Sequence, residues 1–169
     1  MDEKVQSQAQ ASSTKVLTIE RIFNTSAERL WQAWTEPELF MRWWGPKDYT
    51  CPVCKIDLRV GGKYLASMRS PEGQDMMWSG GVFREIIPTS RLVFTDMFTD
   101  PEGNLIPASQ YGMADWPDVL LVTLTFSEPE PGKTLLTLRH EGMPEGQNRD
   151  LTSEGWRQSF DKLAKLVQE

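Results

Sequence analysis

His140 is the only histidine in the 169-residue sequence, and it ends a stretch in which it alternates with Leu136 and Leu138. Because successive residues of a strand point to opposite faces, this alternation would turn all three side chains toward the interior. A buried imidazole can act as a general base or contact a ligand, but a lone histidine on an apolar face is more often a core residue. Spacing places no serine, aspartate or second histidine to complete a nucleophilic triad.

The only two cysteines form a C-x-x-C motif at Cys51 and Cys54. A thioredoxin-like motif opens a helix after a strand, whereas this one enters an extended segment that would place the two sulfurs on opposite faces. A zinc site would need two more ligands, and the chain has one histidine and no further cysteine. We interpret the pair as a buried Cys54 and a less buried Cys51, and we expect no metal and no cofactor.

Arg21 is another residue that could do chemistry, since it shares a strand face with Leu17, Ile19 and Phe23. From that face a guanidinium could bind the carboxylate of a ligand in a cavity. Equally, it could lie at the edge of the sheet with its stem packed and its charged head in water.

Eight methionines and seven tryptophans give a broader signal. Methionine adapts to irregular surfaces, and mixed methionine and aromatic linings suit apolar pockets, although the same residues also build ordinary cores. The candidate cavity residues come from the expected strands, the flap and the C-terminal helix: Arg21, Cys54, Ile56, Tyr64, Met68, Trp78, Phe94, Met97, Met113, Trp116, Leu120, Leu138, His140, Trp156 and Phe160.

These side chains must be positioned by strands and helices whose patterns are clear. Residues 25–46 indicate two short helices, with capping boxes at Thr25 and Glu28 and at Thr35 and Glu38. Such short helices need a large partner. We therefore predict that they close one end of the sheet, with Trp34 and Trp43 largely buried and at least one of them touching the C-terminal helix or the inner sheet face.

The pattern of the rest of the chain predicts a run of strands and one amphipathic helix. The helix covers residues 153–168 after a polar linker at 142–152, and residues 100–118 form an ordered flap that is too long for a hairpin turn. This order predicts an α+β fold whose sheet is covered on one side. The expected strands cover residues 16–24, 49–59, 63–70, 76–87, 91–98, 119–126 and 134–140.

Length and composition predict one domain at residues 15–169 after a disordered polar tail at 1–14. The net charge of −6 argues against nucleic acid and anionic membranes as partners. No apolar stretch is long enough to span a membrane, and the first residues have no signal-peptide core, so a cytoplasmic location is expected.

Together these segments resemble a known family. The sequence WQAWTEPELFMRWWGP, followed by DLRVGGKY, GVFREIIPTSRLVFTD, LTLRHEGMP and GWRQSFDKLAKLV, is similar to the START-like (SRPBCC, Bet v 1-like) superfamily. Within it, the match is to proteins like the activator of heat-shock protein 90 ATPase, over residues 15–168. The resemblance implies a helix-grip fold: a curved antiparallel sheet of about six to seven strands around a long C-terminal helix, with two short helices after the first strand.

The resemblance also implies candidate functions, because members commonly enclose a cavity for lipids, polyketides or other apolar molecules. The leading hypothesis is a binding protein for an apolar small molecule, without a defined catalytic centre. The first alternative is a chaperone-interacting protein like the named activator. The second is an enzyme similar to the superfamily's cyclases and dehydratases, with His140 as acid or base.

Overall fold

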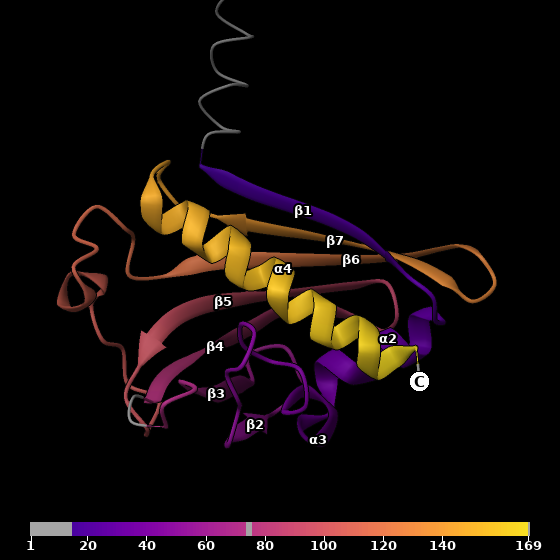
Figure 1. Ribbon diagram of the computed structural model, residues 1–169, viewed down its shortest axis with the longest axis horizontal. Helices are drawn as coiled ribbons and strands as arrows, with labels where there is room; N and C mark the ends of the chain where they lie inside the picture. The colour runs from indigo at the N-terminus through magenta and orange to yellow at the C-terminus, as the bar shows by residue number, and fades with distance from the viewer. Residues whose placement is uncertain (1–14, 74–75, 169) are drawn as a thin grey trace, which may run out of the picture.

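A long helix, α4 (Gln147–Val167), lies against one side of a curved seven-stranded sheet in the computed structural model (Figure 1). The structure describes residues 15–73 and 76–168, so the predicted disordered tail at 1–14 lies outside the described residues. Within the described ranges, no helix is both long and apolar enough to cross a membrane. The predicted α+β helix-grip fold is confirmed.

All neighbouring strands are antiparallel, in the order β1-β7-β6-β5-β4-β3-β2. The first strand therefore pairs with the last, while the other strands form a meander. The elements are β1 (Val16–Phe23), α2 (Ala27–Thr35), α3 (Pro37–Phe40), β2 (Cys54–Ile56), β3 (Lys63–Arg69), β4 (Met76–Ile87), β5 (Arg91–Thr99), the 3-10 helix η1 (Ala108–Tyr111), β6 (Leu120–Glu130), β7 (Lys133–Glu141) and α4.

Alternation sets the register of the central strands. Leu136, Leu138 and His140 of β7 are all buried, and the residues between them are less buried. In register, Leu17 of β1 and Val122 of β6 both lie opposite His140. The apolar face that these strands share is the face on which α4 packs, so the core lies between sheet and helix.

Helix α4 begins at Gln147, six residues before the predicted start at 153, so the predicted linker is wrong over its second half. The apolar stripe runs from Trp156 to Val167, as expected. The first two turns carry Asn148, Leu151 and Thr152, which line a cavity instead of filling the core. Because these turns face a cavity, they lack the apolar period by which a helix is recognised.

The caps of the short helices differ from the predicted capping boxes. Ser26, and not Thr25, caps α2, since its Oγ accepts from the backbone N–H of Arg29 at 3.1 Å. Thr35 belongs to α2 and donates its hydroxyl to the Trp31 carbonyl at 2.8 Å. Helix α3 has no side-chain cap; it starts at Pro37, whose missing N–H is not needed there.

The two short helices close one end of the grip, as predicted. Trp43 is fully buried and Trp34 nearly so. The Trp34 ring lies 4.6 Å from that of Trp43, 6.1 Å from that of Trp156 and 6.2 Å from that of Phe160, as measured between ring centroids. We call Trp34, Phe40, Trp43, Trp44, Trp156 and Phe160 the aromatic plug.

Strand boundaries differ most where turns intervene. The strand predicted at 49–59 is reduced to β2 (Cys54–Ile56), because Pro52 precedes it and the Gly61-Gly62 turn follows. The strand predicted at 119–126 continues to Glu130 in β6. The flap at 100–118 is ordered: Thr99 pairs with Leu105, and η1 follows.

A hydrogen bond inside the plug gives a testable prediction. The Ala33 carbonyl would normally accept from the N–H four residues later, but that residue is Pro37, and the Trp43 indole N–H takes its place at 2.9 Å. Replacing Trp43 by Phe leaves this buried carbonyl unpaired. We expect the free energy of unfolding to fall by about 1–3 kcal/mol, measured by chemical denaturation.

Trp44→Phe is the matched control, because its indole nitrogen is buried without a hydrogen-bond partner. Losing that N–H removes an unpaired polar group, so the free energy of unfolding should change far less. Equal losses in the two variants would show that ring volume, and not the hydrogen bond, matters.

Candidate functional site

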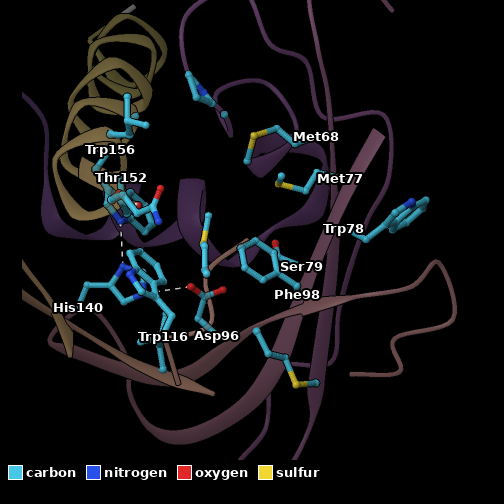
Figure 2. Close-up of a pocket in the computed structure, with 18 of the residues that line it drawn as sticks. Met68, Met77, Trp78, Ser79, Asp96, Phe98, Trp116, His140, Thr152 and Trp156 are labelled. Atoms are coloured by element: carbon cyan, nitrogen blue, oxygen red, sulfur yellow. Dashed lines mark hydrogen bonds and ion pairs between the residues drawn. The ribbon is translucent and has the colours of Figure 1, made fainter. Parts of the chain in front are cut away.

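A cavity of about 280 Å³ lies between the N-terminal half of α4, the ends of β4 and β5, and the flap (Figure 2). Its volume lies just below the range of about 300–1,000 Å³ that is typical of ligand pockets. Most lining side chains are apolar, and the exposed Met77 and Leu151 are among them. The polar side chains of the lining are Ser79, Asp96, Asp118, His140, Asn148, Thr152 and Ser159.

The structure distributes the candidate residues over three environments. Ile56, Tyr64 and Phe94 surround a second hollow of only about 20 Å³. Leu138 and Phe160 are buried in the core, and Cys54 packs half-buried against it. The candidates that line the main cavity are Met68, Trp78, Met97, Met113, Trp116, Leu120, His140 and Trp156.

Arg21 lies at the surface and not in the cavity. Its Nη1 is 2.6 Å from Oδ1 of Asp161 on α4, and the two side chains are 35% and 67% exposed. Its guanidinium carbon lies 5.5 Å from the centre of the Phe23 ring. Of the two interpretations, the one with a packed stem and a solvated head therefore holds, and such an exposed pair adds little stability.

The two cysteines have the reverse of the predicted burial. Cys51 is buried at 4% exposure and Cys54 is half-buried. The alternation invoked for them fails because Cys51 precedes β2 and is not in a strand. Burial raises the pKa of the Cys51 thiol to about 11 and that of Cys54 to about 12. Among the described residues, no group of histidine, cysteine, aspartate or glutamate side chains could hold a metal ion.

Both thiols should accordingly be slow to react in the folded protein. At pH 8 iodoacetamide should alkylate them far more slowly than after unfolding in guanidinium, because the thiolate is the nucleophile. Mass spectrometry over time measures the ratio. Similar rates in the two states would contradict the burial described above.

The same raised pKa values set a pH dependence of stability. The usual thiol pKa of 9.0 lies below the folded values, so the folded state keeps these protons longer. Their contribution to the free energy of unfolding is present below about pH 9 and is lost as the pH rises through about 11–12. A Cys51→Ala, Cys54→Ala variant should show a shallower decline over that range in chemical denaturation.

Lys162 fixes one wall of the cavity. From α4 its ammonium group donates to the carbonyls of Pro46 at 3.2 Å and Tyr49 at 3.0 Å. Partial burial lowers the pKa of this lysine. The bonds hold the loop that presents Gly45 and Pro46 to the cavity. Sequence reasoning placed Lys162 only off the apolar stripe, since nothing local indicates a partner more than a hundred residues away.

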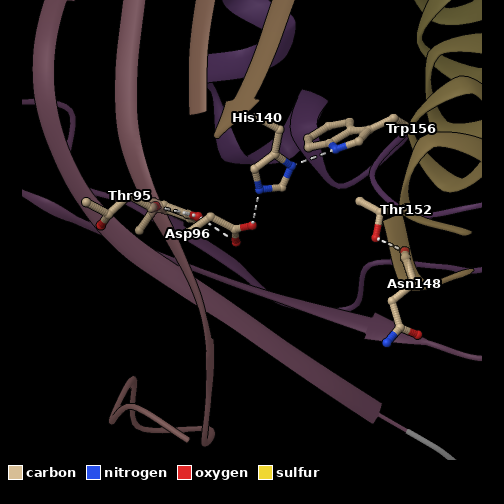
Figure 3. Close-up of polar contacts among 7 residues, drawn as sticks. Thr95, Asp96, His140, Asn148, Thr152 and Trp156 are labelled. Carbon is tan, nitrogen blue, oxygen red and sulfur yellow. Dashed lines mark hydrogen bonds and ion pairs between the residues drawn. The ribbon is translucent and has the colours of Figure 1, made fainter. Parts of the chain in front are cut away.

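His140 lies between α4 and the sheet with its two nitrogens in different environments (Figure 3). Nδ1 accepts from the Trp156 indole N–H at 3.1 Å. Nε2 is 3.0 Å from Oδ2 of Asp96, but it lacks the alignment of a hydrogen bond. Because Nδ1 is an acceptor here, the ring is neutral with its proton on Nε2. Any proton transfer by His140 would have to pass through Nε2.

Asp96 is the site residue that sequence reasoning missed. Its Oδ1 is 3.5 Å from the Tyr64 hydroxyl, which donates to the Thr95 carbonyl at 3.0 Å. Burial, together with the nearby Asp96 carboxylate, raises the pKa of Tyr64 well above its usual value, so this hydroxyl remains a donor. The signal was present: Asp96 shares a strand face with Phe94 and Phe98, where a charged residue is unexpected.

The tautomer of His140 can be measured directly. In a long-range ¹H–¹⁵N spectrum, the neutral ring should show a protonated Nε2 and an unprotonated Nδ1. Trp156→Phe removes the donor to Nδ1 and should allow the other tautomer to be populated. A wild-type ring protonated on Nδ1 would contradict the hydrogen bond from Trp156.

A curved antiparallel sheet gripping a C-terminal helix is the architecture of the START-like class. The chain belongs to the Activator of Hsp90 ATPase homolog 1-like protein family, whose model matches residues 24–168. No protein of curated function matches the sequence.

Solved structures share this fold. A crystal structure of a protein from Chromobacterium violaceum is 26% identical, with a TM-score of 0.76 over 92% of this chain and 98% of that one. A solution structure of an AHSA1-like protein from Aeromonas hydrophila is 21% identical, with a TM-score of 0.68 over 90% of this chain and 92% of that one. A crystal structure from Nitrosomonas europaea is 24% identical, with a TM-score of 0.75 over 92% and 96%.

Proposed function

We propose that this protein binds a compact, largely apolar small molecule in the cavity between α4, the sheet and the flap. The observation that carries the proposal is a cavity of about 280 Å³ whose apolar walls include four methionine and four tryptophan side chains. Covering apolar walls with an apolar ligand removes their surface from water, which favours binding. Methionine side chains allow such a lining to adjust to the ligand.

Polar side chains add support. Asp96, His140 and Thr152 interrupt the apolar walls of the cavity. A small number of polar groups in a mainly apolar pocket fixes the orientation of a ligand. We place this binding function in the cytoplasm, and it requires no cofactor.

Gly155 offers a sharp test, because it lines the cavity from α4. A Cβ there would meet only Cγ of Pro46, at an ordinary 3.5 Å. Gly155→Leu should therefore fold, fill part of the cavity and abolish binding of the neutral fluorescent probe N-phenyl-1-naphthylamine. Fluorescence titration measures the binding.

Gly155→Ala is the matched control. It should keep most of the cavity and the probe affinity, and it should gain up to about 1 kcal/mol of stability, since glycine is unfavourable inside a helix. Probe binding that is unchanged in Gly155→Leu would place the probe elsewhere. No binding to the wild type would count against the proposal.

A second candidate follows from the family itself, which takes its name from an activator of the Hsp90 ATPase. We propose stimulation of the ATPase of the host's Hsp90 homologue as the activity to test. Purified chaperone with and without this protein distinguishes the candidates, and Gly155→Leu should leave stimulation unchanged if the cavity is not involved. No stimulation would end this candidate.

A further inference from the structure

We infer that the ligand is a cation: a protonated amine on a compact apolar body, with Asp96 as its charged partner. This inference rests on the proposed binding function and specifies which molecules the cavity accepts.

The first argument is the charge of the lining. Asp96 and Asp118 both line the cavity, and none of its described lining residues is lysine or arginine. The nearby Lys162 donates to the main-chain carbonyls of Pro46 and Tyr49. His140 adds no positive charge, because its Nδ1 accepts from Trp156. The cavity is therefore negative, and a ligand carboxylate would meet two like charges without a counter-ion.

The second argument is the unused bonding capacity of Asp96. Its side chain is 24% exposed and lies in the cavity lining (Figure 2). The Tyr64 hydroxyl gives its proton to Thr95 at the shorter distance, and the His140 contact is not aligned. Each carboxylate oxygen has two lone pairs, so both can accept a further strong hydrogen bond beside these contacts. An ammonium group donates such bonds, and its positive charge offsets the free-energy cost of burying a carboxylate.

The rim carboxylate has a different role. Asp118 is exposed, and its Oδ1 already accepts from the Ala108 N–H at 3.0 Å. It raises the negative potential at the flap without offering a free buried contact. Asp118 therefore attracts a cation, whereas Asp96 holds it.

The third argument is the aromatic surroundings. Trp116 and Trp156 are buried at 8% exposure, and with Trp44 they supply indole groups to the lining. Indole faces attract cations, most strongly where water is excluded. A lining that combines a carboxylate, indole rings and methionines suits an amine with an apolar body. It is a poor environment for an anionic lipid.

Three probes with the same apolar body test the charge: 4-phenylbutylamine, 4-phenylbutan-1-ol and 4-phenylbutyrate, titrated calorimetrically at pH 7. We expect the amine to bind the wild type at least about tenfold more tightly than the alcohol, from one charge-assisted contact. The carboxylate should show no binding.

Asp96→Asn, which keeps the shape of the side chain, should bring the amine to within about twofold of the alcohol. Glu20→Gln, on an exposed position of β1, changes the net charge equally and should leave the preference intact. Gly155→Leu should abolish binding of both the amine and the alcohol. The affinities of the three probes for the wild type show whether a positive charge is preferred, even if a variant fails to fold.

Other outcomes overturn the inference. Equal affinity for amine and alcohol, or tighter binding of the carboxylate, would show that the ligand is not a cation. The proposed binding function would stay in place. The same holds if N-phenyl-1-naphthylamine binds and the amine does not. If neither that probe nor any of the three compounds binds, the inference fails together with the proposed function.

Discussion

An aromatic contact joins the short helices to α4, because Trp34 of α2 packs on Trp156 and Phe160. Short helices such as α2 and α3 are marginal alone, and here they are held by the helix that they help to position. Arg29 adds a polar link, because its guanidinium donates to the carbonyls of Val167 at 2.9 Å and Leu166 at 3.3 Å, where the helix dipole is negative. Helix α2 lies beside the C-terminal end of α4 (Figure 1). The cavity is lined by residues 148–159, toward the N-terminal end of α4.

Trp156 connects the packed end to the cavity. One part of its side chain belongs to the aromatic plug, while its indole N–H reaches His140 on β7. From His140 a line of polar contacts continues to Asp96 on β5 and Tyr64 on β3. Polar groups at such depth are costly unless they have partners. Asp96 and His140 of this line belong to the cavity lining, so the proposed ligand would meet its middle.

The fold could be predicted because its signals are local and repeated. The alternation that ends at His140, the stripe that contains Trp156 and Phe160, and the glycine turns each define an element without knowledge of its partners. The cavity was only partly predictable. Cys51 and Cys54 were misassigned because alternation was extended into a segment that is not a strand. Asp96 was overlooked because its importance comes from its contact with His140, which is 44 residues away in the sequence. The two side chains meet only through the register of the paired strands. The cavity wall at Pro46 likewise depends on a contact with Lys162, which is distant in the sequence.

The residues that hold the fold are largely distinct from those that would set the preference for the proposed ligand, so a family match does not name a ligand. Apart from the half-buried Trp44, the aromatic plug is buried and contributes to stability, so its residues tolerate little change. Asp96, by contrast, is partly exposed at the end of β5 and makes no aligned, short hydrogen bond that the sheet requires. Its charge could change without disturbing the contact between Trp34 and α4. Members of one family could therefore keep the grip and bind ligands of different charge, because most of the lining comes from strand ends, a flap and the first turns of α4, and it shares Trp44 and Trp156 with the aromatic plug.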